Sequence, residues 1–378
     1  MIGRMACAGH SGFMEQSITT SSHLLWLKLK CVSRVGPRTV KRLLDVLGGI
    51  KDIFEADRSL LESVPGGLRV WHSMGNRTVA AVAEKILLQV QAADYSLCTP
   101  DDPCFPDSLR EARHVPPVLF VRGSLNGRSR SVAVVGSRYP SSEGARVARN
   151  WARDFALAGF TVVSGLAYGI DAAAHRGALE AGGHTVGVLG CGPDKVYPPD
   201  HDGLARDIVQ AGGAVISEFW PGTEPAPYNF PTRNRTIAGL ARAVIVVEAA
   251  EKSGALHTAK MARSYGRPVY AVPGPLSRTT SAGTNQLIRA GASVALSSAQ
   301  VIEELGGVAG ERIDVESLSL SPLQRDIWDQ LDGAGVHLDL IARKLRMSTP
   351  KLLTELLQME LMGVVHQLPG KRFQIGTI

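Results

Sequence analysis

Residues 131–190 decide the fold: they read SVAVVGSRYPSSEGARVARNWARDFALAGFTVVSGLAYGIDAAAHRGALEAGGHTVGVLG. Two short β-branched runs, Val132–Val135 and Thr161–Val163, flank a longer stretch, Ser142–Ala158. Apolar residues in that stretch recur at the i, i+4 and i+8 spacing of a helix, and Gly159 suits the position just after its end. A strand, a helix and a strand in succession predict an α/β domain.

Similar apolar runs continue along the chain. Each is continuous rather than alternating, as in parallel strands that are buried on both faces. The sequence therefore predicts an extended Rossmann-like domain with a doubly wound, mostly parallel sheet. We expect VLFVRG, which ends at Gly123, to form an edge strand. The further runs are Val186–Leu189, Ala214–Ile216, Ala243–Val247 and Val269–Val272.

The residues before this domain are typical of short helices. A Gly36-Pro37 turn precedes apolar residues at helical spacing, and Gly48-Gly49 ends that helix. Such a turn resembles those of helix-hairpin-helix and SAM-like modules, whose amides can face a phosphate. An ordinary turn in a small helical packing domain is the alternative. We expect a disordered tail at 1–23, this helical domain at 24–94 and the Rossmann-like domain at 95–306.

The end of the chain predicts a winged-helix-like domain over residues 320–378. A polar linker at 307–319 precedes two helices, expected around Leu323–Leu331 and Leu340–Leu345. Ser348 can cap a third helix, which is rich in leucine. Two strands are expected around Pro369-Gly370. Three helices followed by a hairpin are the layout of a winged helix.

Composition indicates a globular protein. The 378 residues are 44% hydrophobic and 20% charged, and the chain is long enough for two or three domains. No apolar run approaches the ~20 residues that would cross a bilayer, and the N-terminus lacks the apolar stretch of a secretory signal. Five scattered cysteines without CxxC spacing favour a reduced cytoplasmic protein with no zinc site.

The net charge of +6 permits nucleic-acid binding without proving it. Residues 1–97 carry 12 Lys and Arg against 8 Asp and Glu, and residues 98–310 carry 21 against 18. Residues 311–378 carry 8 against 9, so the positive charge lies in the first two segments. A nearly neutral C-terminal part argues against a winged-helix transcription regulator, because duplex binding depends on phosphate neutralisation.

Distinctive loops follow the predicted strands. In open α/β sheets ligands bind beyond the carboxyl ends of the strands, where glycine lets backbone amides approach an anion. The arginine of the first loop can take a phosphate with two hydrogen bonds. The residues that we expect to bind phosphate in these loops are Gly136, Ser137, Arg138, Ser164, Gly165, Gly190 and Lys195.

A second basic cluster, Phe230–Arg235, is expected to open a helix at Thr236–Ala241. Cations in the first turn of a helix oppose its dipole, so they imply an anionic partner. That partner is either a phosphate or a protein carboxylate such as Glu218 or Glu248, which would orient the arginines. The three donors of this cluster are Arg233, Asn234 and Arg235. Aromatic residues make up 6% of the chain, and the candidates for base stacking are Tyr168, Phe219 and Phe230.

Motifs for nucleotide cofactors and for nucleophilic catalysis are missing. The first loop is Gly-Ser-Arg rather than GxGxxG, and no GxxxxGK[ST] occurs. No serine or cysteine nucleophile motif accompanies His175, so that residue is interpreted as a packing histidine. Asp171 is suited to capping a helix or accepting its amides. We expect no catalytic residue, no metal and no cofactor.

These loops together resemble the DNA-processing protein A (DprA/Smf) family. The matching stretches run in order through about 170 residues: GSR, SGLAYGIDAAAH, LGCGPDKVYPP, ISEFWPGTEPAPYNFPTRNRTIAGLA, VIVVEAAEKSGALHTA, VPGPL and GTNQLIRAGA. The helical N-terminal part and the winged-helix-like C-terminus are similar to the flanking parts of that family. An ordered set of this length is far more specific than any one of its motifs.

The resemblance implies single-stranded DNA binding, a homodimer, and loading of the RecA recombinase in natural transformation, without a cofactor. Mapped by motif, Arg138 is the phosphate-contacting arginine, and Ser164, Gly165, Arg233 and Asn234 line the same pocket. Many relatives have a basic residue after the Tyr-Pro pair, where this chain has Pro199. Either Lys195 replaces that contact or the contact is missing.

Two other functions stay open. Nucleotide phosphoribohydrolases share a related Rossmann-like fold, but VEAAEKSGALHTA stands where their PGGxGT signature would be expected. A transcription regulator would work through the winged helix. The leading hypothesis is a protein that protects single strands and helps to load RecA, holding phosphates without reading sequence.

Overall fold

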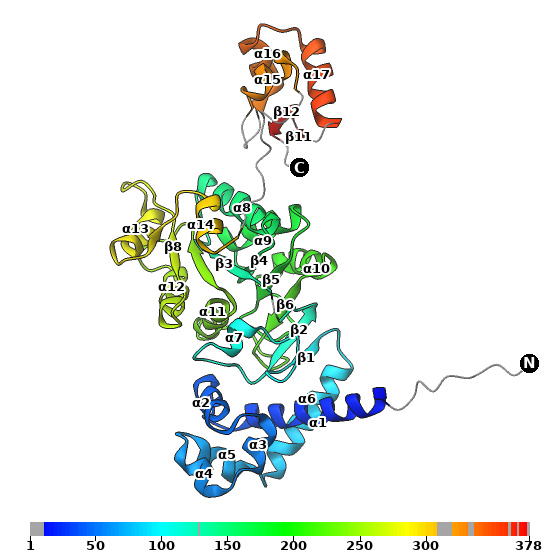
Figure 1. Ribbon diagram of the computed structural model, residues 1–378, viewed down its shortest axis with the longest axis vertical. Coiled ribbons are helices and arrows are strands. Elements are labelled where there is room, and N and C mark those ends of the chain that lie inside the picture. The colour runs from blue at the N-terminus through cyan, green and yellow to red at the C-terminus, as the bar shows by residue number, and fades with distance from the viewer. Residues whose placement is uncertain are drawn as a thin grey trace, which may run out of the picture. The chain divides into compact units, whose positions relative to one another are not determined.

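The structure is a computed structural model that describes residues 11–127, 129–307, 320–331, 336–361, 364–368 and 370–375. The chain forms two compact units, Met1–Val308 and Ala309–Ile378. The first holds a helical part and a large sheet, and the second holds a smaller helical and β-stranded module (Figure 1). In the described residues no helix is long and apolar enough to cross a membrane.

The helical part differs from prediction at its start. Helix α1 begins at Ser11, whereas we expected no regular structure before Leu24; residues 1–10 lie outside the described residues. Trp26 and Leu27 of α1 are buried, and a helix anchored in this way gains one hydrogen bond for each residue that it adds. The helices before the first strand are α1 (Ser11–Cys31), α2 (Pro37–Leu47), α3 (Ile50–Glu55), α4 (Arg58–Ser63), α5 (Gly67–Ser73) and α6 (Arg77–Gln91).

The described strands of the first unit form one nine-stranded sheet in the order β1-β2-β6-β5-β4-β3-β7-β8-β9. In this order every pair of neighbours from β6 through β9 is parallel, as predicted. Apart from the short, exposed β9, these strands are buried and rich in valine and alanine. Their bounds are β1 (Ser96–Cys98), β2 (Leu119–Gly123), β3 (Ser131–Val135), β4 (Thr161–Ser164), β5 (Thr185–Val188), β6 (Ala214–Ser217), β7 (Ala243–Val246), β8 (Val269–Ala271) and β9 (Ser293–Val294).

The prediction that VLFVRG forms an edge strand is wrong. Strand β2 pairs antiparallel with β6 on one side and with β1 on the other, so β1 is the outer strand. Strand β1 is only three residues long and lies in a proline-rich connector. Its period-2 pattern is therefore too short to be recognised in the sequence.

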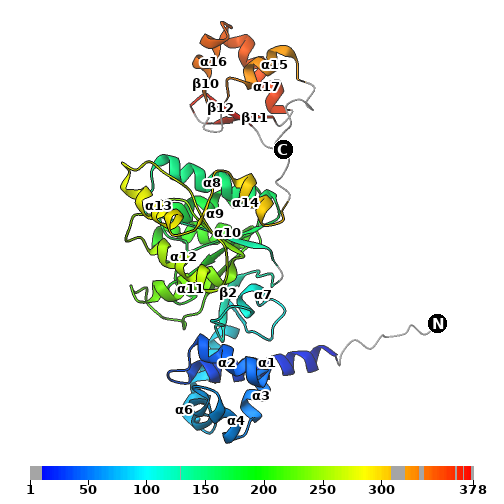
Figure 2. The ribbon, with the colours of Figure 1, turned by 60° about the vertical axis from the view of Figure 1, so that its left-hand side comes forward.

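Helices cover both faces of the sheet, which confirms the doubly wound prediction (Figures 1 and 2). One face carries α8 (Ser142–Leu157), α9 (Ile170–Glu180), α10 (Asp202–Gln210) and α14 (Ser298–Glu304), and the other carries α7 (Asp107–Arg110), α11 (Asn229–Leu240) and α12 (Gly254–Ser264). Helix α13 (Ala282–Arg289) contacts β8. Helix α8 begins where the Ser141 hydroxyl accepts from the Gly144 amide and is followed by Gly159 at φ +77°, as its sequence predicted.

The direction of winding reverses beside β3. From β3 the chain proceeds through β4, β5 and β6 on one side, and it then returns to β7 on the other side of β3. The loops that leave β3 and β7 therefore run to opposite faces of the sheet. The carboxyl ends of these two strands are the place where a doubly wound sheet leaves a ligand crevice.

The second unit has the predicted elements and one more strand. Its described helices are α15 (Pro322–Trp328), α16 (Leu338–Lys344) and α17 (Thr349–Leu361), and its described strands are β10 (Val336–His337), β11 (Val365–Leu368) and β12 (Arg372–Ile375). The predicted hairpin β11–β12 is confirmed, and β10 pairs with β12 as a third strand. Its core includes Ile327, Ile341, Leu352 and Phe373. Apart from Gly307, the predicted linker lies outside the described residues.

His175 of α9 is a packing residue, as its sequence context indicated. Its ring is fully buried, and Nδ1 lies 2.7 Å from the Thr185 hydroxyl oxygen. That hydroxyl donates its own hydrogen to the Val162 carbonyl, so the histidine Nδ1 must donate to the hydroxyl oxygen. In this tautomer Nε2 is the acceptor nitrogen, and it has no hydrogen-bond partner among the described residues. Burial, helped by positive charge nearby, lowers the pKa of His175 to about 3.

We expect this histidine to make the fold sensitive to acid. Between pH 6.5 and pH 3 the histidine is protonated in the unfolded chain but stays neutral in the folded chain. The unfolded state is therefore favoured, and stability is lost, as the pH falls. From pH 7 to pH 5.5 this site should lower the free energy of unfolding by about 1 kcal/mol. Urea unfolding of the wild type and of His175→Gln at both pH values measures the difference. An equal loss in the two proteins would show that His175 is not its source.

Candidate functional site

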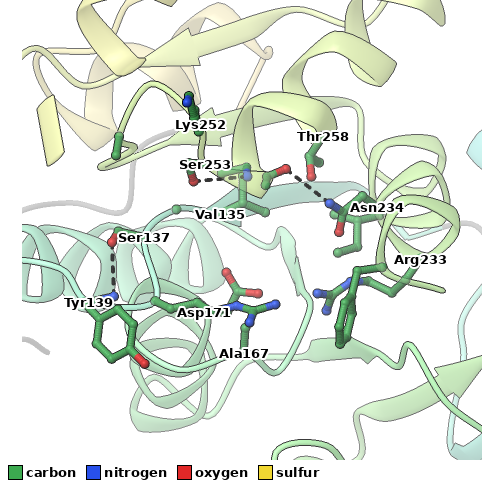
Figure 3. Close-up of a pocket in the computed structure, with 17 residues that line it drawn as sticks. Val135, Ser137, Tyr139, Ala167, Asp171, Arg233, Asn234, Lys252, Ser253 and Thr258 are labelled. Atoms are coloured by element: carbon green, nitrogen blue, oxygen red, sulfur yellow. Dashed lines mark hydrogen bonds between the residues drawn. The ribbon is translucent and has the colours of Figure 1, made fainter. Parts of the chain in front are cut away.

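A pocket of about 370 Å³ lies at the crevice between β3 and β7. This volume falls within the range of ordinary ligand sites. Its wall includes the loop after β3, the loop after β7 and helix α11, and Asp171 of α9 contributes from below (Figure 3). Apolar side chains form part of the lining: Val135, Ala167, Phe230, Ile237, Ala250 and Ala255.

The loop after β3 is held by backbone contacts. The Ser137 amide donates to the Glu248 carbonyl at 2.7 Å, and the Ile170 amide donates to the Ser137 carbonyl at 3.1 Å. Gly169 has φ +75°, and a Cβ there would lie 2.4 Å from the Ser137 carbonyl oxygen, so only glycine fits. The loop is thus fixed close to the start of α9 before any ligand arrives.

Two buried side chains of opposite charge, Arg233 and Asp171, line the pocket and attract one another. Arg233 Nη1 donates to the carbonyl of Gly165 and, at 3.2 Å, to that of Val188. The Asp171 carboxylate accepts from the Gly165 amide at 3.0 Å and attracts Arg233. A Cβ on Gly165 would overlap the Arg233 guanidinium, which is why a glycine stands here. The pair joins α11 and α9 to the ends of β4 and β5.

Burial governs the electrostatics of this pair. Desolvation raises the pKa of Asp171, although Arg233 and the loop amides oppose that shift. Desolvation also lowers the pKa of Arg233, with Asp171 acting against the shift and Arg138 adding to it. Each charge therefore stabilises the other, and the main role of Arg233 is to hold the loops in place rather than to bind a ligand.

Arg138 is placed differently. Its side chain is exposed, and its guanidinium carbon lies 5.2 Å from the centroid of the Phe230 ring. None of the described residues forms an ion pair or a hydrogen bond with this guanidinium. Arg138 therefore presents a charge to the pocket with its hydrogen-bond donors available.

The opposite wall adds two more features that favour an anion. Helix α12 begins at Gly254, and its first turn, which carries partial positive charge, lines the pocket. The Ser253 hydroxyl accepts from the Ala255 amide at 3.3 Å, and Asn234 donates to the Gly254 carbonyl at 3.2 Å (Figure 3). Lys252 is exposed at the same wall, and the described part of the chain holds no carboxylate within 4 Å of its ammonium.

The structure brings together half of the predicted phosphate-binding residues. Those that line the pocket are Gly136, Ser137, Arg138, Arg233 and Asn234. Ser164 and Gly165 lie behind it, where the Ser164 hydroxyl donates to the Val134 carbonyl at 2.7 Å. The others outside the lining are Gly190, which packs on Phe230, Lys195, which pairs with Glu224, and Arg235, which donates to the Thr232 hydroxyl at 2.7 Å.

Helix α11 starts earlier than predicted. It begins at Asn229 rather than near Thr236, so Arg233 and Asn234 lie in its second turn and not in its first. Pro231 is its third residue, where the missing N–H would have no partner within the helix anyway. The argument that cations at a helix start imply an anion therefore fails for these residues, and Asp171 is the carboxylate that faces Arg233.

The two glutamates do not orient the site arginines. Glu248 accepts from the Ser141 amide at 2.9 Å and lies 3.5 Å from Arg278. Glu218 accepts a hydrogen bond from the Thr236 hydroxyl, and burial raises the pKa of its carboxyl. Both glutamates fasten loops around the site instead.

The sequence did not point to several residues that line the pocket. They include Tyr139 and the polar residues Lys252, Ser253 and Thr258. Tyr139 is 83% exposed and follows Arg138 directly, which was a usable signal. Lys252 lies in the loop after β7, at the second strand end of the crevice, and could have been identified from the strand order alone.

Comparisons with known proteins agree with this fold. The family model described as DNA recombination-mediator protein A matches residues 96–306, and that of the DprA winged helix domain matches residues 315–371. The second unit is therefore a winged-helix domain, as predicted. The protein Smf of Synechocystis sp. is 34% identical over 400 residues, which cover 94% of this chain and 100% of that protein.

Two solved structures are similar as well. The X-ray structure of DNA processing protein A from Streptococcus pneumoniae matches with a TM-score of 0.59 and 32% identity, over 73% of this chain and 95% of that one. The protein from Helicobacter pylori, described for its single-stranded DNA binding mode, matches with a TM-score of 0.51 and 28% identity, over 56% of this chain and 96% of that one. The chain belongs to the DprA/Smf family of DNA recombination-mediator proteins.

Proposed function

We propose that the chain binds single-stranded DNA by holding a phosphate in the pocket between β3 and β7. The observation that carries this proposal is the pair of cations Arg138 and Lys252, which face the pocket from its two loops without a carboxylate partner among the described residues. The first turn of α12 adds partial positive charge. The binding of single-stranded DNA by the related protein of Helicobacter pylori supports it.

A phosphate site of this kind does not read sequence, because every nucleotide offers the same phosphate. A pocket of about 370 Å³ is small compared with a strand of several nucleotides, so a longer strand needs several such sites. A homodimer would provide two of them. We propose that such a dimer protects the strand and presents it to the RecA recombinase, a role that the family description as a recombination mediator supports.

A nucleotide-cleaving enzyme is the competing function, because Asp171 supplies a buried carboxylate to a pocket of nucleotide size. The electrostatic attraction of Asp171 to Arg233 and the hydrogen bond that it accepts from the Gly165 amide account for it as a structural residue. Incubation with nucleoside monophosphates should therefore release no free base. Release that is lost in Asp171→Asn would favour the enzyme.

The main test compares binding of single- and double-stranded oligonucleotides across a salt series. We expect the single strand to bind more tightly, and log affinity should fall linearly with log salt concentration. Preference for the duplex would contradict the proposal and favour DNA binding through the winged-helix domain.

We expect Tyr139 to stack on a base next to the bound phosphate. Its ring is 83% exposed at the pocket mouth, and stacking of one base on an aromatic side chain contributes roughly 1–3 kcal/mol. Tyr139→Ala should weaken binding of oligo-dT about tenfold, whereas Tyr139→Phe, which keeps the ring, should bind as the wild type does. Fluorescence anisotropy measures both. Equal losses in the two variants would assign the effect to the hydroxyl and not to stacking.

A further inference from the structure

Two cysteines lie at the ends of a tight turn between β1 and α7. Cys98 is the last residue of β1, and Cys104 follows six residues later. The segment contains two consecutive hydrogen-bonded turns. The Asp102 amide donates to the Thr99 carbonyl at 2.9 Å, and the Phe105 amide donates to the Asp102 carbonyl at 3.0 Å. The turn therefore returns the chain toward its starting point and brings the two side chains together.

The Asp102 carboxylate makes this turn rigid. It accepts from the Thr99 amide and from the Thr99 hydroxyl, both at 2.7 Å. Its own charge is stabilised by His23 of α1, whose Nε2 lies 2.9 Å away. Because the turn is fixed on both sides, the positions of the two thiols do not depend on a flexible loop.

The two thiols interact and differ in accessibility. Cys98 and Cys104 share a side-chain hydrogen bond, which raises the pKa of Cys98 and lowers that of Cys104. Cys98 is 1% exposed, whereas Cys104 is only partly buried. Cys104 is therefore both the more accessible thiol and the one whose thiolate form is stabilised by the interaction. The thiolate is the nucleophile in disulfide exchange.

We propose that Cys98 and Cys104 form a reversible intramolecular disulfide by exchange with a small-molecule disulfide, with Cys104 as the attacking thiol and Cys98 as the resolving thiol. The Cys104 thiolate attacks one sulfur of the small disulfide, forms a mixed disulfide and releases one thiolate. The Cys98 thiol then loses its proton, attacks the Cys104 sulfur and releases the second small thiol. Two protein thiols are oxidised to one disulfide, and one small disulfide is reduced to two thiols.

The disulfide would strengthen the contact between helix α1 and the turn that follows β1. The same turn carries Asp101, which accepts from the Ser22 hydroxyl at 2.6 Å and from the Trp26 indole at 2.9 Å. A covalent link between the ends of the turn fixes the acceptors that hold α1. Oxidation should therefore stabilise the attachment of α1 to the sheet, since the link removes open conformations of the turn.

The test equilibrates the full chain, carrying Cys7→Ser, in a series of reduced and oxidised glutathione mixtures. The reaction is quenched with a thiol-blocking reagent and the disulfides are located by peptide mass spectrometry. We expect the Cys98–Cys104 disulfide to form in the folded protein at an oxidant ratio about tenfold lower than in 8 M urea, because the fold holds the thiols together. By the thermodynamic cycle, oxidation should then raise the melting temperature.

Two variants complete the experiment. Cys104→Ser should prevent Cys98 from entering a disulfide at these glutathione ratios, whereas Cys31→Ser, which removes another partly buried thiol, should leave formation of the Cys98–Cys104 disulfide unchanged. The comparison of the folded chain with the chain in urea does not depend on either variant folding. A Cys98–Cys104 disulfide that forms no more readily in the folded chain than in urea, a fall in melting temperature on oxidation, or pairing of Cys104 with another cysteine would each overturn the proposal.

Discussion

Arg138→Ala is expected to weaken binding of single-stranded DNA about 10- to 100-fold, because a charge-assisted, two-point contact to phosphate contributes ~1.5–3 kcal/mol. Its guanidinium is exposed above the Phe230 ring, and the described residues offer it no ion pair. Loss of one phosphate contact should also reduce the slope of log affinity against log salt by about 0.7. Poly-dT and mixed sequences should lose affinity equally, since phosphate carries no base information.

Two further variants separate charge from geometry. Arg138→Lys keeps the charge but not the planar pair of donors, so it should lose less affinity than the alanine variant. Arg149→Ala removes the same charge from a position where Arg149 pairs with Glu180, at the end of α9 away from the pocket, and it should bind normally. Titrations at several salt concentrations measure all three variants against the wild type.

The melting temperature distinguishes this role from a structural one. An exposed arginine that forms no ion pair with the described residues should leave the stability of the DNA-free protein almost unchanged. If Arg138→Ala melts earlier while its affinity and salt slope stay the same, Arg138 holds the loop in shape and the phosphate site lies elsewhere.

The sequence predicted the central sheet because its strands are buried on both faces. Each of the six parallel runs is continuous and β-branched, and each became a strand within about one residue of its predicted bounds. Strands with short or partly exposed runs were missed: β9 and β10 are two residues long and carry no recognisable period. Pairing between segments distant in the chain creates such strands, and no local pattern records it.

The candidate site was predicted in part for the same reason. Loops at the carboxyl ends of parallel strands meet at one edge, so Gly136, Ser137 and Arg138 could be placed from strand order alone. The partner of Arg233 could not, because Asp171 lies 62 positions earlier and meets it only once α9 and α11 pack on opposite faces of the sheet. Pro231 also concealed the start of α11, since proline usually marks a helix boundary.

The other large effect is expected from Arg233→Met, which should lower the free energy of unfolding by about 3–5 kcal/mol. Methionine fills a similar volume but leaves the Asp171 carboxylate buried without its counter-charge, and it removes the donor to the Gly165 and Val188 carbonyls. Urea unfolding followed by circular dichroism measures the loss. Arg235→Met is the matched control: Arg235 is a neighbouring, half-buried arginine that donates to a hydroxyl on its own helix, so its loss should be much smaller.

A double-mutant cycle and its pH dependence test the cause. Asp171→Asn removes the negative charge that attracts Arg233. The loss of unfolding free energy in the double variant should therefore be smaller than the sum of the two single losses by about 1–3 kcal/mol. Burial already raises the pKa of Asp171, and loss of Arg233 should raise it further. A carboxyl whose folded pKa is raised takes up its proton more readily when folded, so the stability deficit of Arg233→Met should shrink as the pH falls from 7 toward 4. A deficit that is independent of pH, with additive single effects, would mean that the lost hydrogen bonds to backbone carbonyls, and not the charge pair, hold the loops beneath the pocket.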